Sequence, residues 1–355
     1  MERKGLILGA IAILALGLYA LRAPLAMQVM RVGAGRAMAA DAVGALPDGL
    51  HLVLCGAGSP LPDPQRSGPC VAVVAGGRLF VVDAGSSAAR NMTSLGLRPG
   101  QVEATFLTHF HSDHIDGLGE LGLLHWAGGN SDQALPVYGP EGVERVAGGF
   151  NEAYRLDAGY RVAHHGVATM PPAGAGLEAR PFETPSVGEP VVVWNENGVK
   201  VTAFRVDHAP VEPAVGYRFD YAGRSLVISG DTAQSAEVEQ MAKGVDLLVH
   251  EALAAHLVKL LTEAATEQGQ TALAKITTDI LDYHTTPVEA AETAQRAGAR
   301  HLLFYHVVPA LPVPGLATAF LDGVSEAYAG SFTLGKDGVR VSLPAGSDAI
   351  DVSGD

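Results

Sequence analysis

The chain has 355 residues, of which 48% are hydrophobic and 43 are glycine, a normal globular composition with material for a substantial core. Its 24 Lys and Arg against 38 Asp and Glu give a formal net charge of -14. A charge of this sign repels polyanions unless a local basic patch overrides it, and it therefore argues against nucleic acid as a partner.

The N-terminal segment predicts contact with a membrane. Residues 5–21 carry no charge and follow Arg3 and Lys4, which is typical of a membrane-targeting segment with its N-terminus inside. The run is short for a membrane span and long for a signal-peptide core. A membrane anchor is favoured, and a cleaved signal peptide and a buried N-terminal helix are the two alternatives. We expect an anchor or signal at 1–22, a linker at 23–49, and a folded domain that is membrane-anchored and periplasmic, or secreted.

The first folded segment contains both cysteines. Short β-rich runs at 50–55, 71–75 and 79–82, separated by Gly and Pro turns, predict the start of a sheet. Cys55 and Cys70 lie in this segment, where an oxidising compartment would permit a disulfide; two buried thiols would explain them equally well.

Strands and helices alternate in the rest of the chain. We expect strands near 191–193, 199–206, 216–220, 225–229, 246–249 and 301–305, and helices near 116–126, 141–154, 288–297 and 317–328. The Gly- and Pro-rich residues 155–190 predict a long loop, whereas 252–283 are expected to be helical and to lie over one mouth of the fold. This mixture favours sheets covered by helices on their outer faces.

Ionisable side chains recur where apolar strands end. Three histidines and Asp113 fall within residues 109–114, directly after the apolar run 104–108, and His208, Asp231 and His306 follow later strands. Because strand ends at one edge of a sheet converge, these side chains are expected to meet. Imidazole and carboxylate groups are the ligands that zinc-type ions accept, and the set is large enough for two ions.

Eight short motifs carry a resemblance to a known family. In chain order they are Leu54–Pro60, Val82–Gly85, His109–His114, Val206–His208, Ser229–Thr232, His250–Ala252, His284–Thr286 and Tyr305–His306. With these motifs the chain resembles the metallo-β-lactamase superfamily, and within it the ribonuclease Z and arylsulfatase-like branch. The resemblance implies an α+β fold, a four-layer αββα sandwich, over residues 50–345, behind the N-terminal membrane segment and before a C-terminal tail at 346–355.

The resemblance also implies roles for individual residues. His109, His111 and His208 would bind a first Zn²⁺, Asp113, His114 and His306 a second, and Asp231 would bridge the two, with Mn²⁺ or Fe²⁺ as alternative metals. Asp113 and His284 would be catalytic, His284 as the proton donor, although it could instead cap the helix that begins near Pro287. Asp83 and Glu251, each at a strand end, are candidates for orienting ligand imidazoles, or for simple turn hydrogen bonds.

The expected reaction is hydrolysis by a metal-bound hydroxide of a small phosphodiester, sulfate ester, carboxylic ester or lactone. Two alternatives are a ribonuclease Z-type endonuclease that processes tRNA 3′ ends and a non-catalytic metal-binding module. Against tRNA stand the membrane contact expected at 5–21, the absence of a basic run in 60–66, and a 155–190 segment with three Arg and no Lys against four acidic residues. A homodimer is left open.

Overall fold

The computed structural model describes residues 2–354 of the chain. These residues divide into two compact units on either side of the Ala42–Val43 bond. The first unit is a single helix, α1 (Glu2–Ala39), which contains Pro24 and continues through most of the segment 23–49 that we expected to be a linker. That segment is rich in alanine, the strongest helix former, which explains why it is helical rather than irregular.

The membrane segment predicted at 5–21 is not supported. Side chains 5, 6, 8–10 and 12–16 of that segment lie outside the described residues. Among the helices that are described, none combines the length and the apolar character that a membrane crossing requires.

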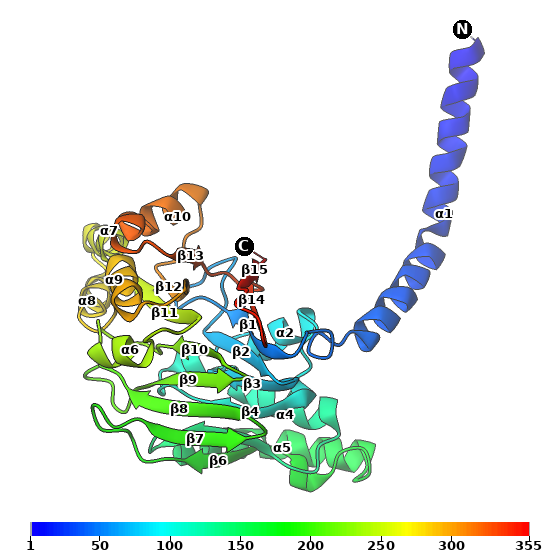
Figure 1. Ribbon diagram of the computed structural model, residues 1–355. Coiled ribbons are helices and arrows are strands. Elements are labelled where there is room, and N and C mark those ends of the chain that lie inside the picture. The colour runs from blue at the N-terminus through cyan, green and yellow to red at the C-terminus, as the bar shows by residue number, and fades with distance from the viewer. Residues whose placement is uncertain (1, 355) are drawn as a thin grey trace. The chain divides into compact units, whose positions relative to one another are not determined.

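Two β-sheets form the second unit (Figure 1). The first sheet has eight strands in the order β15-β14-β1-β2-β3-β4-β5-β6: β1 (Gly49–Gly56), β2 (Cys70–Ala75), β3 (Arg78–Val82), β4 (Val102–Phe106), β5 (Leu135–Gly139), β6 (Leu177–Pro181), β14 (Arg340–Pro344) and β15 (Asp351–Ser353). The second has seven, in the order β13-β12-β11-β10-β9-β8-β7: β7 (Val191–Glu196), β8 (Val199–Arg205), β9 (Val215–Tyr221), β10 (Arg224–Ile228), β11 (Leu247–Leu253), β12 (His301–Val308) and β13 (Ser331–Leu334).

The main core lies between the two sheets. Leu50, Leu52 and Leu54 alternate along β1 and are all buried in it, as the two-residue period of a strand requires. Phe106 on β4 and Phe219 on β9 meet edge to face, with ring centroids 5.8 Å apart, so aromatic side chains from both sheets interlock at the centre.

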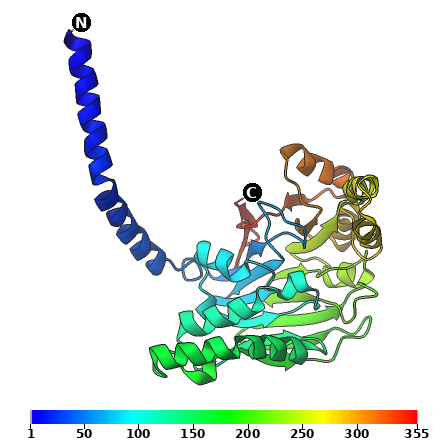
Figure 2. The same ribbon diagram turned by 180° about the vertical axis from the view of Figure 1, so that it is seen from behind.

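Helices cover the outer face of each sheet. On the first sheet lie α2 (Ala88–Ser94), α4 (Leu118–Gly129) and α5 (Val143–His165), seen from behind in Figure 2; α3 (Ser112–Ile115) is a single turn before α4. On the second lie α6 (Ala236–Met241) and α9 (Pro287–Ala297), with α7 (Ala255–Glu267), α8 (Thr271–Asp279), α10 (Pro314–Phe320) and α11 (Val324–Ala327) beyond them. The predicted arrangement of sheets with helices on their outer faces is confirmed.

A disulfide joins Cys55 to Cys70 and so links the end of β1 to the start of β2. The register between these two antiparallel strands shifts between Leu54 and Gly56, at the same place. Of the two alternatives that the sequence left open for these cysteines, the structure has the disulfide.

Two segments differ from the sequence-based expectation. Helix α5 continues to His165, eleven residues beyond the predicted end, and stops at Gly166, whose φ of 81° favours glycine. Ion pairs along its surface, such as Asp157 with Arg161, support the extra turns. The rest of the predicted 155–190 loop includes the short 3₁₀ turn η2 (Pro172–Gly174) and strand β6.

The C-terminal residues are folded rather than a free tail. Strand β15 pairs with β14, and the buried Arg224 donates to the carbonyl oxygens of Pro344 and Ala349. Arg224 also forms two hydrogen bonds of 3.0 Å with Asp246, which in turn accepts from Arg300 at 2.7 Å. These contacts hold the chain end against the second sheet.

Candidate metal centre

The predicted ligands come together from both sheets. His109 and His111 follow β4, and Asp113 and His114 belong to the single turn α3. His208 follows β8, Asp231 follows β10, and His306 lies in β12. All seven fall into clusters whose donor atoms lie within 4.8 Å of one another. The strand-end pattern in the sequence therefore corresponds to a real meeting point in the fold.

Close backbone packing sets the position of the histidine run. The amide of Gly117 donates to the carbonyl of Ala84 at 2.8 Å, and the amide of Ala84 donates to the carbonyl of His114 at 2.8 Å. A Cβ atom on Gly117 would collide with the carbonyl oxygen of Gly85, and one on Gly85 would collide with that of Asp113. The turn after β3 and the turn α3 can approach this closely only because both positions are glycine.

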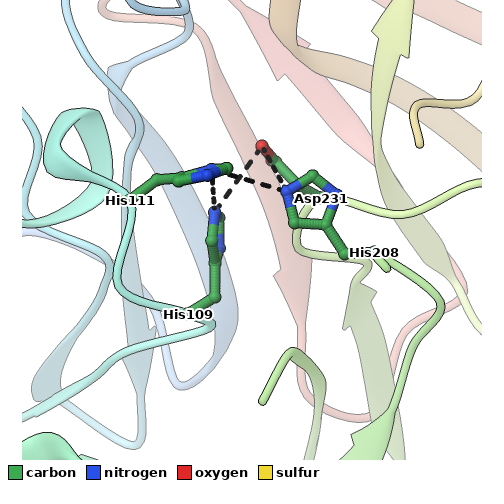
Figure 3. Close-up of side chains that lie close together, drawn as sticks. All are labelled: His109, His111, His208 and Asp231. Atoms are coloured by element: carbon green, nitrogen blue, oxygen red, sulfur yellow. Dashed lines mark hydrogen bonds and ion pairs between the residues drawn. The ribbon is translucent and has the colours of Figure 1, made fainter. Parts of the chain in front are cut away.

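The first cluster contains His109, His111, His208 and Asp231, shown in Figure 3. His111 Nδ1 lies 3.0 Å from His109 Nε2 and 3.5 Å from His208 Nε2. The nearer carboxylate oxygen of Asp231 lies 3.9 Å from His109 and 4.0 Å from His208. Burial lowers the pKa of all three histidines, which keeps them neutral, and neutral imidazole is the form that binds a metal.

The second cluster contains Asp113, His114 and His306. His306 Nε2 lies 3.2 Å from Asp113 and 3.3 Å from Asp231, and His114 Nε2 also lies 3.3 Å from Asp231. The same oxygen of Asp231, Oδ2, therefore faces both clusters. Its position is the one that a carboxylate bridging two ions requires.

The electrostatics of the second cluster call for a cation. Burial lowers the pKa of His114, but the carboxylates of Asp231, Asp83 and Asp113 outweigh burial and raise that pKa well above the usual value. Nε2 of His114, which is buried and faces Asp231 Oδ2 at 3.3 Å, forms no hydrogen bond to any of the described residues. Because buried polar groups are normally satisfied, this donor set fits a site for two metal ions.

Asp83 holds one of the histidines in place. Its Oδ2 accepts a hydrogen bond of 2.8 Å from His114 Nδ1, which leaves His114 Nε2 directed at the cluster. Its two oxygens also accept from the hydroxyl and the amide of Thr108, each at 2.8 Å. Asp83 and His306 both have left-handed backbones, with φ of 58° and 44°, which non-glycine residues seldom adopt.

Glu251 and His284 form a buried pair beside the clusters. Glu251 Oε1 accepts from His284 Nδ1 at 3.0 Å and from the amides of Thr285 at 3.0 Å and Thr232 at 3.2 Å. Burial lowers the pKa of His284, but the charge and hydrogen bond of Glu251 outweigh it and raise this pKa to about 8. The raised pKa favours the imidazolium, and because Glu251 occupies Nδ1, Nε2 is the ring nitrogen available to a substrate.

His284 does not cap the helix that follows it. The N-cap of α9 is Thr286, which forms a reciprocal capping box with Glu289. His284 instead stacks against His306, with ring centroids 5.6 Å apart, and belongs to a third cluster with Asp231 and His306. The helix-cap alternative is therefore excluded.

A cavity of about 280 Å³ opens over these residues. One side is formed by site residues such as Asp113, His284 and His306, and another by α8 and the loop at Pro60 and Leu61. The prediction that residues 252–283 are helical and lie over a mouth of the fold is confirmed, because α8 lines this cavity.

Sequence reasoning missed several residues that hold the site together. The hydroxyl of Thr108 donates a hydrogen bond to Asp83, and the amide of Thr232 donates one to Glu251. The carbonyl of Tyr283 accepts a hydrogen bond of 3.0 Å from His208 Nδ1. Thr108 directly precedes the histidine run, a position that could have drawn attention to it. The contacts of Thr232 and Tyr283 use main-chain atoms, for which side-chain chemistry gives no signal.

Comparison with known proteins identifies the class. A family model described as "Beta-lactamase superfamily domain" matches residues 78–307. Among solved structures, the metallo-β-lactamase fold protein YhfI from Bacillus subtilis superposes with a TM-score of 0.59 at 17% identity, covering 83% of this chain and all of that one. The chain belongs to the metallo-β-lactamase superfamily, and its ribonuclease Z branch is supported by the relatives below. It is a metal-dependent hydrolase of that fold rather than a non-catalytic metal-binding module.

The relatives specify the branch. Ribonuclease Z of Mycobacterium avium is 34% identical over 300 residues, which are 84% of this chain and all of the relative. Ribonuclease Z of Mycobacterium bovis is 34% identical over 296 residues, 83% of this chain and 98% of the relative. The short form of human tRNase Z superposes with a TM-score of 0.57 at 20% identity, covering 83% of this chain and 99% of that one.

These relatives correct the expected substrate. The prediction of an exported hydrolase for a small ester, with nucleic acid an unlikely partner, is wrong, because proteins named ribonuclease Z match along their whole length. The formal charge of -14 misled because it is a sum over the whole chain. It also omits the metal ions, and two divalent ions would place four positive charges at the site itself.

The expected localisation is corrected as well. A membrane-anchored periplasmic domain, or one secreted after signal cleavage, was inferred from residues 5–21 alone. No described helix has the properties of a membrane span, and the matching proteins are ribonuclease Z. Contact of residues 5–21 with a membrane is therefore no longer expected.

Proposed function

We propose that this protein is a ribonuclease Z-type endonuclease that hydrolyses a phosphodiester bond at the 3′ end of a tRNA precursor. The observation that carries the proposal is the 34% identity to ribonuclease Z over the whole length of that relative. The geometry agrees with it, since a two-metal donor set beside a protonated histidine suits phosphodiester hydrolysis.

We assign the seven donors to two Zn²⁺ ions. His109, His111 and His208 would hold one ion, Asp113, His114 and His306 the other, and Asp231 both, as their grouping around Asp231 Oδ2 suggests. Ions bound there would lower the pKa of a water molecule towards ~7 and stabilise negative charge on the phosphoryl oxygens. Asp83 would keep His114 in its ligand orientation through their 2.8 Å hydrogen bond.

His284 and Asp113 would handle the protons. As the attacking oxygen bonds to phosphorus, the bond from phosphorus to the leaving oxygen breaks and that oxygen keeps the electron pair. His284 would donate its Nε2 proton to this oxygen, while Glu251 fixes the ring through Nδ1. Asp113, which lines the cavity, would accept the proton that the attacking water loses as its oxygen bonds to phosphorus.

The test uses a tRNA precursor with a 3′ trailer and the metal-replete full-length chain. We expect cleavage at the trailer junction and close to two metal ions per chain. Asp231→Ala should lower both, because Asp231 Oδ2 faces both clusters. Asp132→Ala, at an exposed aspartate between α4 and β5, is the matched control and should change neither. A chain that holds two ions yet leaves the precursor intact would refute the proposal.

A further inference from the structure

The cavity over the metal centre has a polar floor and an apolar wall. The floor is formed by His111, Asp113, Asp231, His284 and His306, and the wall by Pro60, Leu61, Leu273, Ile276, Ile280 and Val308. No Lys or Arg occurs among the described residues that line the cavity. The part of a substrate that lies along the wall is therefore neither a phosphate nor another charged group.

Helix α8 and its C-cap residue supply half of this wall. Leu273 and Ile276 lie in α8 and Ile280 is its C-cap residue; spaced three and four residues apart, they lie on one face, which borders the cavity. Ile276 is 57% exposed and Leu273 is 40% exposed, although both are large apolar side chains. Covering such side chains with an apolar group is favourable, so this face is suited to bind one.

An aromatic ring next to the proposed proton donor also lines the cavity. Tyr283 lines the cavity, and its ring centroid lies 4.9 Å from that of His284 and 4.8 Å from that of His208. Its carbonyl accepts a hydrogen bond from His208, so the residue is fixed to the site. A half-buried aromatic ring of this kind is a surface on which a nucleobase can stack.

We propose that Tyr283, Ile276 and Ile280 bind the nucleobase of the nucleotide that carries the leaving oxygen. The proposal rests on the proposed function, because it assumes an RNA phosphodiester as the substrate. His284 must reach the leaving oxygen, and Tyr283 adjoins His284, so the base attached to that sugar is the part of the substrate nearest to the wall.

The wall also defines which bases it accepts. Apolar and aromatic contacts form no hydrogen bonds with the edge of a base, so they do not discriminate between the four bases. The site therefore binds any base and loses this contact only with an abasic nucleotide. At about 280 Å³ the cavity is at the small end for ligand sites and takes a single nucleotide rather than a duplex. The base must therefore be unpaired.

The experiment compares two short single-stranded RNAs that differ only in whether the leaving nucleotide carries its base or is abasic. With the wild-type chain, removal of the base should lower kcat/KM by roughly 5- to 100-fold, the range for one stacked base. Ile276→Asn should lower kcat/KM about fivefold on the RNA with the base and leave the abasic RNA unaffected. Leu260→Asn is the matched control, since Leu260 is 56% exposed on α7 and does not line the cavity.

The outcomes separate this proposal from the proposed function. Equal losses for Ile276→Asn on both RNAs, or an equal loss for Leu260→Asn, would overturn the base site. Cleavage of the tRNA precursor with no preference for the base would overturn the base site and leave the tRNA function intact. Cleavage of the short RNA with the expected preference, but none of the precursor, would support the base site and refute tRNA as the substrate.

Discussion

The pair of Glu251 and His284 allows a quantitative prediction. Glu251→Gln keeps an oxygen that can accept from His284 and from the amide of Thr285, but it removes the negative charge. The pKa of His284 is raised from 6.5 to about 8 although burial lowers it. At ~1.36 kcal/mol per pH unit this difference corresponds to roughly 2 kcal/mol in favour of the imidazolium, which is the form that can donate a proton.

The loss should depend on the leaving group. Without the charge of Glu251 the pKa of His284 should fall, so that at a pH well above 8 proton donation to a poor leaving group should weaken by about 30-fold, the equivalent of ~2 kcal/mol, and by less at neutral pH. Removing the imidazole in His284→Ala should lower the rate by roughly 10² to 10⁴. A nitrophenyl leaving group needs little proton donation, so both variants should retain most of their activity on a nitrophenyl phosphodiester.

The assay measures kcat for two phosphodiesters that differ only in an alkyl or a nitrophenyl leaving group, together with metal content. The double variant should be no slower than His284→Ala, because both changes affect one proton transfer. Glu263→Gln, an exposed glutamate on α7, serves as the control. Equal losses on both esters, or loss of metal from Glu251→Gln, would refute the reasoning and leave the pair a structural role.

Two further predictions concern stability. Gly117→Ala should destabilise by about 1–3 kcal/mol in urea unfolding and lower the metal content, because its Cβ collides with the Gly85 carbonyl; Gly148→Ala, with open space around it, should do neither. Burial raises the pKa of Asp246, but hydrogen bonds led by Arg224 outweigh it and lower this pKa below 3.8. The stabilisation from Asp246 is therefore present above about pH 4 and is lost as pH falls through the lowered pKa. We expect Asp246→Ala to lower the free energy of unfolding by about 3 kcal/mol at pH 7 and by progressively less in acid.

Either result could fail in an informative way. If Gly117→Ala kept its full metal content and stability, the close approach of the two turns would not position the histidine run. A stability difference for Asp246→Ala that is the same at pH 3 and pH 7 would show that the carboxylate charge contributes nothing to folding.

The sequence predicted the site better than the surroundings of the site. His208, Asp231 and His306 are far apart along the chain, but each lies at or near the end of an apolar strand, and that pattern is visible in the sequence. The bonds that orient the site are less visible. Glu251 is held by two main-chain amides, those of Thr232 and Thr285, and a main-chain donor leaves no trace in residue type.

The errors came from properties averaged over long stretches. The localisation was inferred from the apolar run 5–21 and the substrate class from the total charge, and both are properties of composition. Which substrate binds depends instead on the few groups that line the cavity. Helix α5 was predicted too short because the Gly- and Pro-rich composition of 155–190 was taken to indicate a loop throughout. Its first eleven residues contain a single glycine, Gly159, and one glycine within a helix costs only about 1 kcal/mol relative to alanine. Surface ion pairs on α5 help to offset a penalty of that size.

The left-handed backbones of Asp83 and His306 have a consequence for engineering. Each conformation costs on the order of 1 kcal/mol, in a fold whose total stability is typically about 5–15 kcal/mol. Glycine at either position would relieve that strain, yet it would remove the side chain that orients His114 or the imidazole that faces Asp231. Selection for thermal stability alone would therefore act against the site, and a more robust version of this enzyme has to gain its stability elsewhere in the sandwich.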